Sequence, residues 1–296
     1  MTSPIRGSSP RWTRRDLLQS AALTAAGASA VNRASAAGPK AEGRIVTRGR
    51  VHQSVCRWCY GKTSLDELCS AAQRMGLVGI DLMTPKDFAT LKKYGLVCTM
   101  TSTHNLAVGL CDPKNHESCL KSIHEAIEAT AKEGWKNVIT FSGNRNGMDD
   151  RVGLENCAKA LKQITPEAEK AGVIIQMELL NSKVNHKDYM CDRSDWGVEL
   201  VKRVGSDHFK LLYDIYHMQI MEGDVIRTIE QNHKYFGHYH TGGNPGRHEL
   251  DDTQELNYKP IEGDRRRGLP GLLRARVHPG ARPLTSLGEA VALCDV

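Results

Sequence analysis

The feature that most constrains the fold is an alternation of short apolar runs with amphipathic helical patterns between residues 51 and 243. The apolar runs lie at residues 51–58, 78–83, 96–103, 137–143, 172–181, 209–217 and 236–243. Helical patterns lie between them, at residues 64–76, 85–95, 116–134, 153–171, 194–205 and 224–233. Runs that are almost continuously apolar are typical of parallel strands buried on both faces.

Seven such strands, with an eighth implied, predict an α/β fold, a (β/α)8 TIM barrel over residues 51–296, rather than an open sheet. The eighth strand should lie near residues 269–277. The segment there reads GLPGLLRARVHPG and has no regular alternation of apolar and polar residues. Pro270 removes a backbone donor, and Arg274 and Arg276 place charge in a strand that should be apolar. We therefore expect strand eight to be short or disrupted.

The N-terminal segment has the pattern of an export signal. Arg14 and Arg15 precede an alanine-rich, weakly apolar run with small-residue cleavage sites. This pattern predicts a twin-arginine signal over residues 1–37, followed by a polar linker over 38–50. No other segment is apolar for the roughly 18 residues that a membrane span needs. We expect an exported protein, periplasmic or otherwise extracytoplasmic, without a membrane span.

The net charge of +6 is concentrated in two segments, residues 1–37 and 265–282. The rest of the chain carries net negative charge, so the barrel has no basic surface of the kind that binds phosphate backbones. We therefore expect no nucleic-acid partner. The nine cysteines include one CxxC pair, Cys56 and Cys59, without the second pair that a zinc site would need. We interpret the cysteines as ordinary core residues.

Three residues with metal-binding side chains lie at the ends of consecutive predicted strands. Glu178 ends strand five, Asp214 lies near the end of strand six, and His240 follows His238 on the same face of strand seven. In TIM barrels the carboxyl ends of the strands form the active site. Two carboxylates and an imidazole predict a divalent metal site for Mn²⁺, Mg²⁺, Co²⁺ or Zn²⁺.

The stretches LLYDIYHMQIMEGD and HYHTGGNPGRHELDDTQELNY resemble the hydroxypyruvate isomerase branch of the xylose isomerase-like TIM barrels. The resemblance runs from about Val51 to Tyr258 and resumes at PLTSLGEAVALCDV. It implies Glu178, Asp214 and His240 as metal ligands, with Glu178 also acting as acid or base. It further implies that His217 and Arg247 bind substrate oxygens.

Further substrate contacts are expected from residues that follow strands three and four, namely His104, Asn144, Arg145 and Asn146. The resemblance implies a metal-dependent isomerase or epimerase of a small hydroxy-carbonyl sugar or sugar acid. In such a reaction a carboxylate removes a proton beside the carbonyl, an enediolate forms, and reprotonation gives the isomer or the epimer. The sequence leaves open the substrate, the metal and whether a homo-oligomer forms.

The family's last strand reads approximately GYxGYxGHEFIP, and its Glu is a metal ligand and the second catalytic base. This chain has no Glu between Glu262 and Glu289. A coding sequence for GYRGYFGHEFIP, read one nucleotide early, can encode GLPGLLRARVHP, the residues at 268–279. We therefore hypothesise a pair of compensating frameshifts, in the gene or in its sequencing, that removed this Glu.

Two alternatives remain open from the sequence. The first is a degenerate barrel that binds a sugar or polyol without turnover, because the strand-eight Glu is missing. The second is a DNA-repair barrel of the endonuclease IV type, which has the same fold. That type needs a richer set of His, Asp and Glu ligands, and the predicted export and the lack of a basic surface count against it.

Overall fold

The computed structural model describes residues 43–49, 51–263, 272–275 and 282–295, which belong to one compact unit, Pro39–Val296. Parallel strands pair in chain order, from β1 to β8, into a closed barrel, so the predicted fold class is confirmed. The strands are β1 His52–Cys56, β2 Gly79–Met83, β3 Val97–Thr101, β4 Asn137–Thr140, β5 Ile174–Glu178, β6 Phe209–Asp214, β7 Phe236–Thr241 and β8 Leu272–Ala275.

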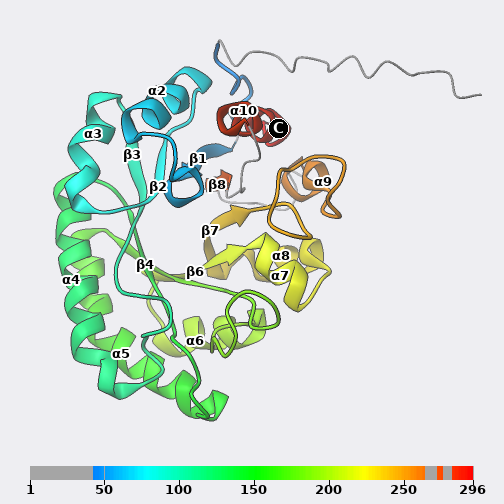
Figure 1. The fold of residues 1–296 in the computed structure, drawn as a ribbon. Helices are drawn as coiled ribbons and strands as arrows, with labels where there is room; N and C mark the ends of the chain where they lie inside the picture. Colours follow the sequence, from blue (N-terminus) through cyan, green and yellow to red (C-terminus); the bar gives the residue numbers. More distant parts are fainter. Residues whose placement is uncertain (1–42, 50, 264–271, 276–281, 296) are drawn as a thin grey trace, which may run out of the picture. The chain divides into compact units, whose positions relative to one another are not determined.

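Helices surround the strands, and α2 to α6 follow one another around the outside of the barrel (Figure 1). The α-helices are α2 Leu65–Met75, α3 Phe88–Lys93, α4 His116–Lys132, α5 Asp150–Ala171, α6 Ser194–Val204, α7 Ile215–Met221, α8 Val225–Asn232, α9 Tyr258–Gly263 and α10 Pro283–Leu293. Helix α2 has the ends that its sequence predicts. The Ser64 side chain accepts a hydrogen bond from the Glu67 amide, and Gly76 ends the helix at a φ of 87°.

Strand β6 ends three residues earlier than the sequence pattern predicts. The apolar run 209–217 suggests one strand, but the strand stops at Asp214 and helix α7 begins at Ile215. The Asp214 side chain accepts a hydrogen bond from the His217 amide at 3.1 Å and so caps the helix. His217 therefore lies in the first turn of a helix and folds back over the strand end.

The eighth strand lies within the predicted region and is short. It has four residues, Leu272–Ala275, compared with six in β6 and in β7. It pairs with β7 on one side and with β1 on the other, which closes the barrel. Arg276 and Val277 occupy the place where the family sequence has its Glu, and both lie outside the described residues. So do residues 264–271 and the other residues of 276–281.

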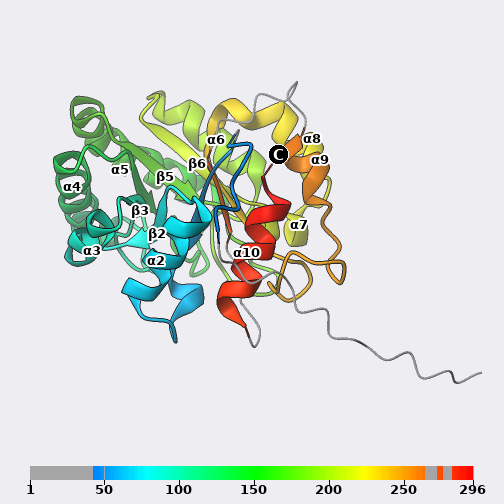
Figure 2. The ribbon, with the colours of Figure 1, turned by 90° about the horizontal axis from the view of Figure 1, so that it is seen from above.

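Residues 45–49, which belong to the predicted linker 38–50, are packed against the barrel. The amides of Ile45 and Val46 both donate to the Met75 carbonyl at 3.0 Å. Residues 47–49 are bound by the side chain of Asp295, which follows α10. Figure 2 shows α10 beside the segment that leads into β1. The predicted signal, residues 1–37, lies outside the described residues.

Apolar side chains from the strands and from the inner faces of the helices form one core. All nine cysteine side chains are buried, which agrees with their interpretation as core residues. Cys56 and Cys59 are among them, at the end of β1 and in the 3-10 turn that follows it. Among the helices that the structure describes, none is both long enough and apolar enough to cross a membrane.

Candidate active site

Strands β5, β6 and β7 bring the three predicted ligand residues together. Glu178 and Asp214 are the last residues of their strands, and Asp214 is the register partner of His240. One ligand atom from each of the three lies within 4.8 Å of the others. The convergence follows from parallel pairing, which places the carboxyl ends of neighbouring strands at one rim of the barrel.

The three side chains are fully enclosed and contact one another directly. The Nδ1 atom of His240 lies 3.1 Å from Glu178 Oε1 and 3.7 Å from Asp214 Oδ2. His240 and Asp214 have no exposed surface, and the Glu178 residue is 1% exposed. Two buried carboxylates beside one imidazole disfavour each other's ionised form unless positive charge lies nearby. This donor set is chemically suited to a divalent cation.

His217 and Arg247, the expected substrate-binding residues, lie beside Asp214. The backbone amide of Asn181 donates to Nδ1 of His217 at 3.2 Å, on the side of the ring away from Nε2. That Nε2 lies 2.5 Å from Arg247 Nη2, and the same Nη2 donates to Asp214 Oδ2 at 3.1 Å. One guanidinium nitrogen of Arg247, which can only donate, therefore links Asp214 to His217.

Arg247 is held by an unusual backbone and by two aromatic rings. Its φ of 60° lies in the left-handed region, which costs a non-glycine residue roughly 1–2 kcal/mol. Its guanidinium lies 5.3 Å from the ring of Trp58 and 4.9 Å from that of Tyr216, contacts that stabilise a cation. Its Nε has no hydrogen-bond partner among the residues that the structure describes. A buried donor of this kind is well suited to an anionic or oxygen-rich ligand.

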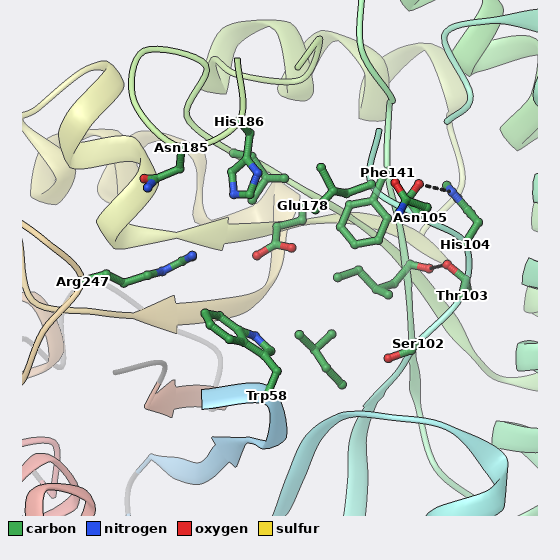
Figure 3. A pocket seen from close by; sticks show the side chains of 14 residues that line it. Trp58, Ser102, Thr103, His104, Asn105, Phe141, Glu178, Asn185, His186 and Arg247 are labelled. Carbon is green, nitrogen blue, oxygen red and sulfur yellow. Dashed lines mark hydrogen bonds between the residues drawn. The ribbon is translucent and has the colours of Figure 1, made fainter. Parts of the chain in front are cut away.

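A cavity of about 620 Å³ opens directly over Glu178. In Figure 3 the Glu178 carboxylate lies between His186 and Trp58, and Arg247 points toward it from the side. The lining residues are Trp58, Leu82, Ser102, Thr103, His104, Asn105, Leu106, Ile139, Phe141, Glu178, Leu180, Asn185, His186 and Arg247. A mixed apolar and polar wall with a carboxylate and a guanidinium is typical of a small-molecule site.

His104 lines this cavity, but both of its ring nitrogens already have partners. Its Nδ1 donates to the carbonyl of Val108 at 2.8 Å, and Nε2 then accepts from the Thr140 hydroxyl at 3.0 Å. Burial lowers the pKa of His104, against a smaller opposing effect of the backbone carbonyls. His104 is therefore a neutral ring that shapes the wall, and it packs edge-on against Phe141.

Asn144, Arg145 and Asn146 do not reach the cavity wall. The backbone of Asn144 pairs with Tyr189 in an isolated bridge, and the Arg145 guanidinium forms ion pairs with Asp150 and Asp192. These contacts tie the loop after β4 to the loop after β5. Asn144 is not among the residues that line this cavity, and its substrate contact stays a prediction.

Sequence reasoning missed Asp81, a buried carboxylate from β2 that lies 2.8 Å from His240 Nε2. Its only signal is an acidic residue inside the apolar run VGIDLM. Sequence reasoning also missed His186, in the segment between β5 and α6, and Trp58, which ends the predicted run 51–58 and lies in the 3-10 turn after β1.

Known proteins are similar to this chain in sequence and in fold. Escherichia coli hydroxypyruvate isomerase is 26% identical over 203 residues, 63% of this chain and 77% of that protein. A 2-oxo-tetronate isomerase of Cupriavidus necator is 37% identical over 105 residues, which are 36% of this chain and 38% of that protein.

Among solved structures, the 3-keto-D-glucoside 4-epimerase of E. coli superposes with a TM-score of 0.69 at 16% identity. That superposition covers 82% of this chain and 98% of the epimerase. A family model described as the xylose isomerase-like TIM barrel matches residues 63–264, and this chain belongs to that family.

Proposed function

We propose that this protein is a divalent-metal-dependent isomerase or epimerase of a small hydroxy-carbonyl sugar or sugar acid, of the hydroxypyruvate isomerase type. The observation that carries the proposal is the convergence of Glu178, Asp214 and His240 beneath a cavity that Arg247 also lines. The E. coli and C. necator relatives are isomerases, which supports the reaction class.

The proposed cation would be held by Glu178, Asp214 and His240. The fit rests on their donor atoms, since carboxylate and imidazole together suit Mn²⁺, Mg²⁺, Co²⁺ and Zn²⁺. The chemistry that such a cation supplies is polarisation of the substrate carbonyl. Its positive charge would also offset the negative charge of the buried carboxylates.

Glu178 is the proposed proton-transfer group. It is the one residue of the buried ligand set that also lines the cavity. Its carboxylate would take the proton from the carbon beside the carbonyl, and the bonding electrons would move to the carbonyl oxygen to give an enediolate. Return of the proton to the neighbouring carbon, with transfer of the hydroxyl proton to the former carbonyl oxygen, gives the isomer. Return to the other face of the same carbon gives the epimer.

Arg247 and His217 would bind the oxygens on which negative charge develops. The Arg247 guanidinium lines the cavity and contacts His217, and donors arranged before reaction stabilise an enediolate without further reorganisation. The Arg247 Nε, which lacks a partner among the described residues, extends the same donor set. A fork of guanidinium donors suits a carboxylate, which favours a sugar acid as substrate.

The missing strand-eight Glu supports a second candidate, a barrel that binds a sugar or polyol without turnover. Residues 263–288 contain no Glu, so the second carboxylate that the family places opposite the strand-five Glu is absent from this segment. One carboxylate suffices to remove a proton, but transfer on the opposite face needs a second group. The two candidates differ in whether substrate protons exchange and whether product forms.

The test is a substrate screen in D₂O with Mn²⁺, followed by proton NMR of the substrate. Three proteins are compared: the chain as it stands, its Glu178→Gln variant, and a version with GYRGYFGHEFIP at residues 268–279. Product from the natural chain supports the isomerase. Binding without exchange or product, with turnover only in the restored version, supports the binding barrel. If neither the natural nor the restored protein binds or converts any substrate, both candidates are wrong.

We further propose that the protein is exported by the twin-arginine route, on the basis of Arg14 and Arg15 and the alanine-rich run that follows. Replacement of both arginines by lysine should retain the protein in the cytoplasm. Cell fractionation of the two forms is the measurement, and equal export of both would exclude this route.

A further inference from the structure

Asp81 reaches the candidate metal centre from β2, although it does not line the cavity. Its Oδ2 atom lies 2.8 Å from Nε2 of His240, while Nδ1 of the same ring faces Glu178 at 3.1 Å. Asp81 and His240 have no exposed surface. His240 is therefore held between two carboxylates, with one on each ring nitrogen.

The backbone around Asp81 is shaped to hold this side chain in place. The register between β2 and β3 shifts on both sides of Asp81, first between Ile80 and Asp81 and again before Met83. Leu82, which lies between Asp81 and Met83, has a φ of 56°, in the left-handed region that a leucine rarely adopts. Bulges of this kind re-aim a side chain, and backbone strain is retained where the surrounding structure requires it.

The second oxygen of Asp81 is also fixed. Thr99, from β3, donates to Oδ1 at 3.0 Å, and His238 Nε2 lies 3.5 Å from the same atom. A carboxylate bound through both oxygens cannot rotate freely. Its orientation toward His240 is therefore set by contacts from β3 and β7 before any ligand binds.

The geometry points to Asp81 as a positioning residue for His240, an inference that rests on the proposed role of His240 as a metal ligand. An ionised carboxylate only accepts hydrogen bonds, so Nε2 of His240 must carry a proton to bind Asp81. The Nδ1 lone pair is then the one available to a cation between Glu178 and Asp214. A carboxylate behind a ligating histidine fixes the ring's tautomer and orientation and makes it a stronger ligand.

This assignment also decides between two overlapping groups of ligand atoms. Asp81, His238 and His240 form a second cluster whose atoms lie within 4.8 Å of one another. A cation in that cluster would compete with Asp81 for Nε2 of His240. The proposal places the cation on the Nδ1 side and Asp81 behind the ring.

The experiment uses ¹⁵N-histidine-labelled full-length protein with and without Zn²⁺, a diamagnetic probe, and assigns His240 through His240→Gln. In the metal-free protein we expect a slowly exchanging Nε2 proton on His240. Zn²⁺ should shift its Nδ1 resonance and leave the Nε2 proton in place. Asp81→Asn should abolish the slow exchange and weaken Zn²⁺ binding by about 10–100-fold.

The matched control is Asp192→Asn, because Asp192 is also buried and hydrogen-bonded but contacts Arg145 and Ser182 instead. It should leave the His240 proton and Zn²⁺ affinity unchanged. If Asp81→Asn does not fold, Thr99→Val tests the same point. This variant removes the hydrogen bond from Thr99 to Asp81 Oδ1, so the Asp81 side chain is less firmly held. The Nε2 proton of His240 should then exchange faster.

The proposal is overturned if the Nε2 proton of His240 exchanges as slowly in Asp81→Asn as in the natural chain. The same criterion applies to Thr99→Val where that variant is used in place of Asp81→Asn. A Zn²⁺-induced loss of that proton in the natural chain would also overturn the proposal. If Zn²⁺ does not bind at all, the proposed metal site fails, but exchange in the metal-free protein still tests the contact between Asp81 and His240. Failure of the two ideas is thus distinguishable.

Discussion

Replacing Asp295 by Asn should destabilise the barrel where its first and last elements meet. The Asp295 carboxylate accepts from the amides of Thr47, Arg48 and Gly49 at 2.7–3.1 Å and from the Thr47 hydroxyl at 2.8 Å. It therefore joins the residue that follows α10 to the segment before β1. An asparagine has one acceptor oxygen in place of two and carries no charge.

The size of the effect follows from the Asp295 pKa. Burial raises this pKa, but the hydrogen bonds from Arg48, Thr47 and Gly49 outweigh burial and lower it from 3.8 to about 2. At about 1.4 kcal/mol per pKa unit, the ionised form contributes about 2 kcal/mol to stability. The asparagine keeps some of the hydrogen bonds, so we expect a loss of about 1–2 kcal/mol at pH 7.

The sign of the pH dependence follows from a lowered pKa. Ionised Asp295 contributes its full stabilisation above pH 3.8, the ordinary pKa of an aspartate. This stabilisation is lost as the pH falls toward the folded-state pKa of about 2. Urea unfolding of the natural chain and Asp295→Asn at several pH values measures the difference. The control is Asp207→Asn, since the exposed Asp207 has a pKa lowered by Lys210, and we expect no measurable change. A difference that is absent at pH 7, or that grows on acidification, would refute this reasoning.

Three further predictions concern the site and the eighth strand. Glu178→Gln should abolish turnover because it removes ligand charge and the proton-transfer group together, and full activity in a steady-state assay would contradict the mechanism. Asp214→Asn should weaken Mn²⁺ binding in a calorimetric titration, while circular dichroism stays native because an asparagine still caps α7. Placing GYRGYFGHEFIP at residues 268–279 should raise both the melting temperature and the Mn²⁺ affinity, and equal values for the two chains would show that the segment has been misinterpreted.

The central part of the site could be predicted from the sequence because it depends on strand ends. Glu178, Asp214 and His240 are found by marking where apolar runs stop, and parallel pairing then brings those ends together. The same logic gives the strand order and the approximate place of β8. Local polar contacts are not encoded in periodicity, and for this reason the start of α7 within the run 209–217 was missed.

Asp81 could not be predicted from the sequence for a different reason. It lies inside a strand, and its inward orientation depends on two register shifts and on the left-handed backbone of Leu82. These features arise from how β2 and β3 fit together and leave no pattern in a single strand. The packing of residues 47–49 was missed for a similar reason, because their partner Asp295 is almost 250 positions away.

The buried cysteines provide chemical probes of the order in which parts of the protein unfold. Burial raises the pKa of Cys98 to about 12 and that of Cys157 and Cys191 well above the ordinary value. Since the thiolate is the reactive form, an alkylating reagent reacts with these residues only after the core opens around them. Cys98 lies in β3 and Cys157 in α5, so the order in which cysteines are alkylated would reveal which layer of the barrel loosens first.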